Sequence, residues 1–365
     1  MRVLMRPGMI RQPAPTPKYL APPGTIRYVA SPMDPLVSVL MPVRDAAATL
    51  GAAIDSVRAQ TLAAWELIAV DDGSSDGSLE LLRSVAVQDV RLRVVQGPPR
   101  GIVAALNEGL RLARAPLIAR MDADDLSLPD RLEAQVRLLD SRPELGLASC
   151  LVECFPAELI SDGMRHYEAW LNGLVEPEQI AVERLVESPL VHPSVLARRS
   201  VLTEYRDGPF PEDYDLWLRM HEAGVRMAKV PRVLLRWRDG DGRLTRTDPR
   251  YGASGFLRLK AAHLARTFLR DRRAVRIWGA GPDGKRWRPI LAEVGIAVAG
   301  FFDIDPRKIG GRVGRQVPVL SWERVPELRD TPLIVAVGAK GARAQIREAL
   351  LGSRLREGAD WLFVQ

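Results

Sequence analysis

Three carboxylates stand close together in the sequence, directly after an apolar run. Asp122, Asp124 and Asp125 follow residues 116–119, which have the pattern of a buried strand. Acids at the end of a strand lie at the carboxyl edge of a sheet, where open α/β folds bind ligands. Because neighbouring carboxylates repel one another, the cluster becomes favourable when Mg²⁺ or Mn²⁺ bridges it. A cation held this way commonly holds phosphates, so the cluster predicts a site for a metal and a nucleotide diphosphate.

A second acidic strand end lies earlier in the chain. Asp71 and Asp72 follow the apolar run 67–70 and precede Gly73. In one parallel sheet, both acidic ends would open at the same edge, where a carboxylate can accept hydrogen bonds from a ribose or a base. Either segment alone could be an ordinary turn, because Asp and Gly favour turns. Their joint position after apolar strands favours a binding site.

Patterns of strand and helix alternate along the chain. Apolar runs predict strands, and apolar residues at helical spacing predict the helices between them. Expected strands are 36–41, 67–70, 92–96, 117–121, 227–230 and 233–237, and expected helices are 46–60, 78 onward, 101–114, 130–140, 177–187, 212–222 and 255–269. This alternation predicts an α/β fold with a mostly parallel sheet and helices on both faces.

A smaller α/β unit follows. A strand at 274–278 leads into the glycine-rich turn 279–284, and strands at 296–302 and 333–337 and a helix at 342–351 come next. This order predicts a small Rossmann-like domain. We expect a structural or oligomerisation role for it, and nucleotide binding by Gly279, Gly281 and Asp303 is the alternative. The predicted division is a Pro/Arg-rich arm at 1–34, a main domain at 35–270 and the Rossmann-like domain at 271–365.

Composition narrows the class of protein. The 365 residues carry a net charge of +7, yet no recognised nucleic-acid motif accompanies the charge, so we expect no nucleic-acid partner. Anionic substrates or peripheral docking at the inner membrane face explain the charge better. No apolar run reaches the ~20 residues that span a bilayer, and the N-terminus lacks a signal-peptide core. Cys150 and Cys154 read as reduced and buried, which favours a cytoplasmic protein.

Several segments resemble the motifs of one enzyme family, in that family's order and spacing. They are Val37-Ser38-Val39-Leu40-Met41-Pro42-Val43-Arg44-Asp45, Asp71-Asp72-Gly73-Ser74, Ala105-Leu106-Asn107-Glu108-Gly109, Arg120-Met121-Asp122-Ala123-Asp124-Asp125, Arg131-Leu132-Glu133-Ala134-Gln135-Val136, His192-Pro193-Ser194-Val195 and Glu212-Asp213-Tyr214-Asp215-Leu216-Trp217. From about residue 35 to 250 the chain resembles the family-2 glycosyltransferases of the GT-A fold. The resemblance implies an inverting transferase that takes a sugar from a nucleotide-sugar, most commonly a UDP-sugar.

The resemblance also implies which residues carry the chemistry. Asp124 would be the principal ligand of Mn²⁺ or Mg²⁺, with Asp125 in support and Asp122 in the metal shell or on the ribose. Asp213, at the start of a helix, would be the base that takes the proton of the acceptor hydroxyl, with Glu212 as the runner-up. Without the resemblance, these two acids would be read as favourable charges at a helix N-terminus.

On the donor side, the resemblance places Pro42 and Val43 along the nucleobase pocket. Asp71 or Asp72 would contact the base or ribose, and Asp72 is favoured. Weaker candidates are Arg100 and Arg120 for the phosphates, His192 for the acceptor side, and Trp237 for stacking on a sugar or simply for packing.

One departure from the family pattern affects the metal site. Many relatives carry a histidine after the segment corresponding to Leu234–Arg238, whereas here Asp239-Gly240-Asp241-Gly242 follows. Asp239 or Asp241 could substitute as a third ligand, or the contact could be absent. The glycine and aspartate content predicts a mobile loop that closes over the donor.

Two other functions remain as alternatives. A sugar-phosphate nucleotidyltransferase would need a glycine- and lysine-rich loop after the first strand, and Pro42-Val43-Arg44-Asp45 is not one. A non-catalytic nucleotide-sugar-binding scaffold would not need both Asp124 and Asp213. The expected setting is cell-surface polysaccharide or glycoconjugate assembly on a glycan, lipid-linked or protein acceptor, with homo-oligomerisation through the Rossmann-like domain.

Overall fold

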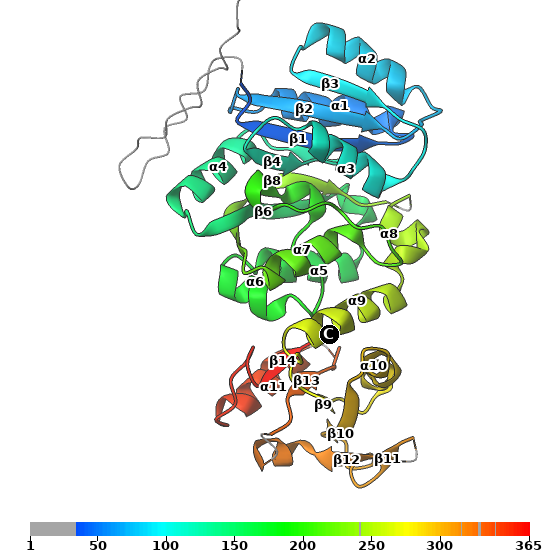
Figure 1. Cartoon of the computed structure of the whole chain (residues 1–365), viewed down its shortest axis with the longest axis vertical. Helices are drawn as coiled ribbons and strands as arrows, with labels where there is room; N and C mark the ends of the chain where they lie inside the picture. Colours follow the sequence, from blue (N-terminus) through cyan, green and yellow to red (C-terminus); the bar gives the residue numbers. More distant parts are fainter. Residues whose placement is uncertain (1–33, 241, 315, 328–329, 340) are drawn as a thin grey trace, which may run out of the picture.

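The computed structural model describes residues 34–365 except 241, 315, 328–329 and 340. The predicted arm at 1–34 therefore lies outside the described residues, apart from Asp34 at its end. Two sheets follow one another along the long axis of the molecule (Figure 1). Within the described residues, no helix combines the length and apolar character that crossing a bilayer would require.

The first sheet is large and mixed. Its strand order is β3-β2-β1-β4-β7-β6-β8-β5. The strands are β1 Val37–Val43, β2 Trp65–Asp71, β3 Leu92–Gln96, β4 Leu117–Arg120, β5 Leu126–Ser127, β6 Leu145–Phe155, β7 Leu196–Arg198 and β8 Arg226–Arg238. Strands β1 to β4 pair in parallel, β7 runs antiparallel to both β4 and β6, and β5 is antiparallel to β8. The predicted α/β class with a mostly parallel sheet is confirmed.

Helices cover both faces of this sheet, as their apolar spacing requires. Leu50, Ile54 and Val57 of α1 join the core on one face, and Leu216 and Met220 of α7 join the core on the other. The helices are α1 Ala47–Arg58, α2 Ser78–Gln88, α3 Ile102–Leu112, α4 Arg131–Ser141, α5 Asp162–Asn172, α6 Pro177–Glu183, α7 Glu212–Glu222, α8 Leu244–Thr247 and α9 Ala253–Arg266.

Between residues 145 and 238 two local predictions were wrong, and the strands β6 and β7 and the helix α5 were not predicted. The strand β6 was not predicted, because Val152 is the only β-branched residue in its segment and the composition therefore does not signal a strand. The two strands expected at 227–230 and 233–237 are one strand, β8, whose register against β6 shifts between Val230 and Val233. The helix expected at 177–187 is shorter and ends at Glu183.

The two cysteines are buried, as the sequence predicted. Cys150 and Cys154 lie on β6, and both are free and buried. Burial raises the pKa of the Cys150 thiol to about 11, so this thiol stays protonated and unreactive at neutral pH.

The second sheet has the order β11-β12-β10-β9-β13-β14 and is parallel except for β11. Its elements are β9 Ala274–Trp278, α10 Pro282–Glu293, β10 Ala297–Asp303, β11 Arg312–Val313, β12 Val317–Ser321, β13 Leu333–Val335, α11 Ala342–Leu351 and β14 Trp361–Phe363. The expected small α/β sheet is therefore present. The predicted boundary at 270/271 falls between α9 and β9.

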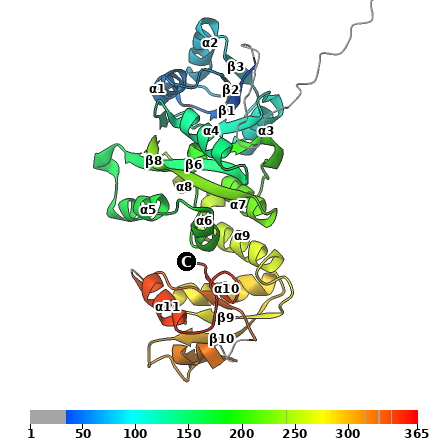
Figure 2. The ribbon, with the colours of Figure 1, turned by 90° about the vertical axis from the view of Figure 1, so that its left-hand side faces the viewer.

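Helices α6 and α9 lie between the two sheets (Figure 2). Glu183 of α6 pairs with Arg343 at 3.0 Å and with Arg347 at 2.8 Å, both from α11. Lys260 of α9 is buried and donates to the backbone oxygens of Val186 and Val364. Because residues from α9 also share one apolar core with β9 and β10, the second sheet is packed against the first rather than tethered by a linker.

Candidate active site

The three carboxylates after β4 form a compact cluster. Asp122, Asp124 and Asp125 each offer one oxygen, and these oxygens all lie within 4.8 Å of one another. Asp125 is 1% exposed. Its Oδ1 accepts a hydrogen bond of 2.7 Å from the backbone nitrogen of Arg238, and its buried Oδ2 has no hydrogen-bond partner among the described residues. Hard oxygen donors with an unsatisfied buried oxygen fit Mg²⁺ or Mn²⁺.

The charges within the cluster also favour a bound cation. Burial, followed by the charge of Asp122, raises the pKa of Asp124 to about 6. Burial and the charges of Asp122 and Asp124 raise the pKa of Asp125 well above its usual value. Asp122 itself forms an ion pair with the buried guanidinium of Arg120. The charges of Arg120 and Arg238 offset the rise in the pKa of Asp124 only in part, so the site favours a further positive charge.

Strand β1 places both acidic strand ends at one edge of the sheet. Val43 pairs with Asp71 in the parallel register of β1 and β2, and the backbone nitrogen of Asp72 donates to the oxygen of Val43 at 2.9 Å. On the other side of β1, the nitrogen of Met121 donates to the oxygen of Leu40 at 3.0 Å. Pro42 and Val43, at the end of β1, therefore stand between the two acidic ends.

The two aspartates after β2 differ in their partners. Asp72 accepts hydrogen bonds from the backbone nitrogens of Arg100, at 2.7 Å, and Gly101, at 2.9 Å. It thereby holds the loop that leads into α3. Asp71 is 1% exposed, and its Oδ1 has no hydrogen-bond partner within the part of the chain that the structure describes. Both line a cavity of about 110 Å³, with the exposed Arg100 at its rim. The geometry thus favours Asp71, not Asp72, as the free acceptor.

Helix α7 begins with the two candidate bases. Glu212 is buried and accepts a hydrogen bond of 2.7 Å from the hydroxyl of Tyr251. Asp213 is partly exposed, and its Oδ1 accepts from the backbone nitrogen of Tyr214 at 2.7 Å. Burial and the neighbouring charge of Glu212 raise the pKa of Asp213 to about 7. The positive charge of Arg120 acts on both Asp213 and Asp124, so the base candidate and the acid cluster lie within electrostatic range of one guanidinium.

His192 is enclosed rather than open to solvent. It is 7% exposed, and its Nε2 lies 3.0 Å from the hydroxyl of Tyr205. Its Nδ1 lies 3.9 Å from Glu212, and Trp217 meets the ring edge-on. Burial and the charge of Arg120 hold the pKa of His192 well below its usual value, so the imidazole is neutral. His192 therefore packs as a neutral core residue beside Glu212, and its hydrogen-bond partner is Tyr205.

The loop after β8 is tied down by arginines. The carboxylate of Asp239 is 2% exposed and accepts hydrogen bonds from Arg243 at 3.2 Å and Arg246 at 2.9 Å. It does not belong to the acid cluster, and Asp241 lies outside the described residues. The guanidinium of Arg243 lies 4.1 Å from the centre of the Trp237 ring. Asp239 is thus engaged in ion pairs rather than placed as a third metal ligand, and one face of Trp237 is covered.

The comparisons with known proteins agree with this geometry. The model of "Glycosyl transferase family 2" matches residues 38–206. The chain is 30% identical over 226 residues to the putative glycosyltransferase EpsE of Bacillus subtilis, across 56% of this chain and 73% of that protein. This chain belongs to glycosyltransferase family 2. It is also 31% identical over 192 residues to the amylovoran biosynthesis glycosyltransferase AmsE of Erwinia amylovora, across 51% of this chain and 69% of that protein.

A solved structure shows the same fold. The S. aureus TarS fragment 1–349, solved in complex with UDP-GlcNAc, superposes with a TM-score of 0.50 at 15% identity and covers 71% of each chain. The similarity confirms the GT-A-type arrangement of this glycosyltransferase.

Four residues of the glycosyltransferase site received no role from the sequence. The backbone nitrogen of Arg238 donates to the carboxylate of Asp125, and its side-chain Nε donates to the backbone oxygen of Asp124 at 2.8 Å. Tyr251 holds Glu212. Asn107 holds Tyr205 through two hydrogen bonds, of 2.9 and 2.8 Å, to its backbone. Of these four residues, only Asn107 stands in one of the family motifs. No sequence pattern indicated the other three, because their contacts join segments far apart in the chain.

Replacing Asp72 with alanine should lower the free energy of unfolding by about 1–3 kcal/mol, because two backbone nitrogens before α3 lose a charged acceptor. Urea unfolding followed by circular dichroism measures this change. The matched control is Asp55→Ala, which removes only an exposed ion pair with Arg58 and should cost about 0–1 kcal/mol. Equal stability of the two variants would contradict the structural role of Asp72.

Proposed function

We propose that this glycosyltransferase moves a sugar, with inversion, from a UDP-sugar to an acceptor hydroxyl with the help of Mn²⁺ or Mg²⁺. The observation that carries the proposal is the cluster of Asp122, Asp124 and Asp125, which unites three hard donors with a buried, unpartnered oxygen. We assign transfer to residues 35–270, which contain the first sheet.

The donor end of the proposed site is built from the ends of β1 and β2. The unpartnered Oδ1 of Asp71 can accept a hydrogen bond from the nucleobase or the ribose, beside Pro42 and Val43. TarS, solved with UDP-GlcNAc, supports a uridine nucleotide for this fold. Arg100 is exposed at the rim and free to approach a phosphate, whereas Arg120 is buried and already paired with Asp122. We therefore give Arg120 an electrostatic role rather than a direct phosphate contact.

The acceptor end is built around the start of α7. An acceptor hydroxyl is a weak nucleophile at neutral pH, and in this proposal Asp213 takes its proton. A pKa of about 7 keeps Asp213 partly ionised and makes it a stronger base than an ordinary aspartate. Glu212 is held by the hydroxyl of Tyr251, so we give it the role of positioning the start of the helix. Attack from this side would expel the diphosphate on the opposite side and invert the anomeric centre.

A bound divalent cation would neutralise the negative charge that develops on the leaving diphosphate. The chain's own contribution there is to hold the ligands in place. The backbone nitrogen of Arg238 donates to the carboxylate of Asp125, and its side-chain Nε donates to the backbone oxygen of Asp124. Because Arg238 is the last residue of β8, the acid cluster is tied to a strand of the sheet rather than to a free loop.

The relatives suggest where the reaction belongs. AmsE is named for amylovoran biosynthesis, and we propose a comparable step in assembling a cell-surface polysaccharide or glycoconjugate. The net charge of +7 suits work at the anionic inner face of a membrane, where a lipid-linked acceptor would lie.

A thermal-shift panel tests the donor and the metal together. We expect UDP with Mn²⁺ to raise the Tm of the full chain more than UDP, Mn²⁺, or ADP or GDP with Mn²⁺ does. A ligand at 100 times its Kd adds about 2.7 kcal/mol of stability. Release of UDP from a UDP-sugar in the presence of Mn²⁺ is the matching activity measurement. If no nucleoside diphosphate stabilises the protein with Mn²⁺, or if none of a panel of UDP-sugars is turned over, the proposal fails.

A further inference from the structure

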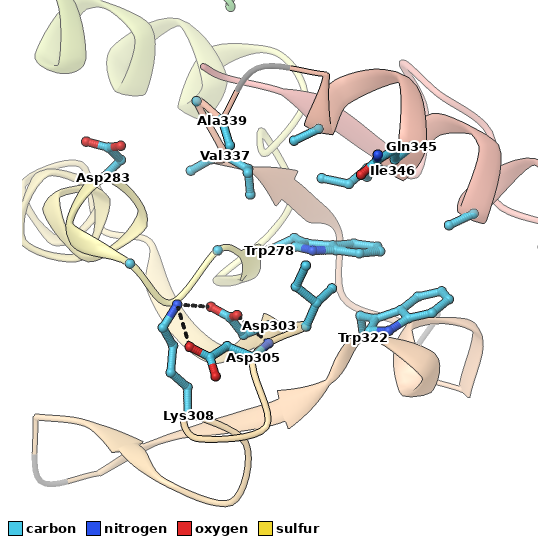
Figure 3. Close-up of a pocket in the computed structure, with 17 residues that line it drawn as sticks. Trp278, Asp283, Asp303, Asp305, Lys308, Trp322, Val337, Ala339, Gln345 and Ile346 are labelled. Carbon is cyan, nitrogen blue, oxygen red and sulfur yellow. Dashed lines mark hydrogen bonds and ion pairs between the residues drawn. The ribbon is translucent and has the colours of Figure 1, made fainter.

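The second sheet contains a larger cavity than the one beside Asp71. It has a volume of about 470 Å³ and lies at the carboxyl ends of β9, β10 and β13 (Figure 3). The chain enters the sheet at β9, continues to β10 on one side, and then crosses to β13 on the other side of β9. The crevice between β9 and β13 is therefore a topological switch point, the position where open parallel sheets bind ligands.

One wall of the cavity is aromatic and apolar. The rings of Trp278 and Trp322 stack with their centres 5.7 Å apart and an angle of 27° between their planes. Ile304 lines the same cavity and is 69% exposed, which is unusual for a large aliphatic side chain. In Figure 3 the two tryptophans face Gln345 and Ile346 of α11 across the cavity. Such a slot fits a flat ring.

The other end of the cavity is polar. The carboxylates of Asp303 and Asp305 lie 3.0 and 4.0 Å from the ammonium group of Lys308 (Figure 3). Asp303 also accepts a hydrogen bond of 2.9 Å from the backbone nitrogen of Ala280, so it joins β10 to the glycine-rich turn. Carboxylates here can accept hydrogen bonds from sugar hydroxyls, and Lys308 has donors left for an anion.

The glycine-rich turn before α10 leaves space open at one side of the cavity. Gly279 has φ +117°, and a Cβ there would lie 2.6 Å from the oxygen of Ala336, so the turn needs glycine to pass β13. Gly281 differs: a Cβ on it would meet no described atom within 4 Å, although the residue lines the cavity. The start of α10 therefore faces open space, and helix N-termini favour negative groups.

We propose that this cavity binds a mononucleotide, separately from the donor site of the first sheet. The base would lie on the wall formed by Trp278, Trp322 and Ile304, and the ribose hydroxyls would donate to Asp303 or Asp305. The phosphate would lie between the start of α10 and Lys308. The inference does not depend on the proposed transferase reaction, because none of these residues belongs to the first sheet.

The test uses the full chain in EDTA, which removes the divalent cation expected to hold a nucleotide at the donor site. Binding of UMP, AMP, GMP, CMP and inorganic phosphate is measured by equilibrium dialysis. We expect at least one nucleotide to bind with Kd below ~1 mM. Gly281→Leu should weaken that binding by about tenfold or more, because Gly281 lines the cavity and a Cβ there meets no described atom within 4 Å, so the added side chain takes ligand space. Lys308→Met should weaken the nucleotide but not the corresponding nucleoside.

Two matched controls make the test specific. A Cβ on Gly352, at the end of α11, would likewise meet no described atom within 4 Å, and the φ of this residue is an ordinary −74°. Gly352→Leu should therefore bind like the wild type. Lys285 is exposed on α10 outside the cavity, so Lys285→Met should also bind normally. The proposal is overturned if no nucleotide binds in EDTA, if Gly281→Leu binds as tightly as Gly352→Leu, or if phosphate alone binds as tightly as the nucleotides.

Discussion

Asp124→Asn should reduce sugar transfer by about two to three orders of magnitude and abolish stabilisation by UDP with Mn²⁺. The variant keeps the shape of the side chain but removes one of three carboxylates, the proposed metal ligands, whose oxygens lie within 4.8 Å of one another. Loss of one preorganised group that stabilises transition-state charge typically costs about 10²–10³ in kcat. Initial rates of UDP release and Tm values with and without Mn²⁺ measure the two effects.

Without metal, the Asp124→Asn variant should have a higher Tm than the wild type. Three neighbouring carboxylates repel one another in the folded protein even though the charges of Arg120 and Arg238 act on Asp124, so removing one negative charge should raise the metal-free Tm. An increase in metal-free stability combined with loss of the Mn²⁺ response is hard to obtain from a damaged fold. The control is Asp55→Asn, at a side chain that is 71% exposed on α1, which should leave both quantities unchanged. Wild-type activity in Asp124→Asn would remove this residue from the site.

Asp213→Asn should lower kcat by about 10²–10⁴-fold, the usual contribution of a positioned general base. Binding of UDP with Mn²⁺ should survive, because the residue belongs to the proposed acceptor side. Comparing kcat with the thermal shift separates these effects. If Glu212→Gln lowers kcat by that amount while Asp213→Asn does not, the base is Glu212 and the hydrogen bond from Tyr251 tunes it.

The pH dependence of the wild-type rate gives a second readout for Asp213. Its pKa is raised to about 7 by burial and by Glu212, so the residue is mostly protonated below that pH and mostly ionised above it. A general base works in its ionised form. The rate should therefore fall by up to about tenfold per pH unit below 7 and level off above it. In Asp213→Asn this dependence should disappear from the residual rate, and its persistence would assign the ionisation to another group.

The sequence was sufficient for the α/β class, for the parallel strands β1 to β4 and for the position of the acid cluster. Alternating apolar runs and helical spacing predict parallel strands, and parallel strands must end at a shared edge. Asp71 and Asp122 therefore had to flank β1 once the order of the strands followed the family motifs. The glycine-rich turn before α10 could also be recognised in the sequence. Its first glycine, Gly279, has a backbone conformation that other residues rarely adopt.

Only the tertiary structure decided which of these polar groups remain free. Asp72 and Asp239 look like ligands in the sequence, yet the backbone at Arg100 and Gly101 occupies one, and Arg243 and Arg246 occupy the other. The wall of Trp278, Ile304 and Trp322 likewise brings together three separate segments. Sequence periodicity reports which face of an element is apolar. The partner of a given oxygen or ring depends on distant segments that meet only when the sheets and helices pack.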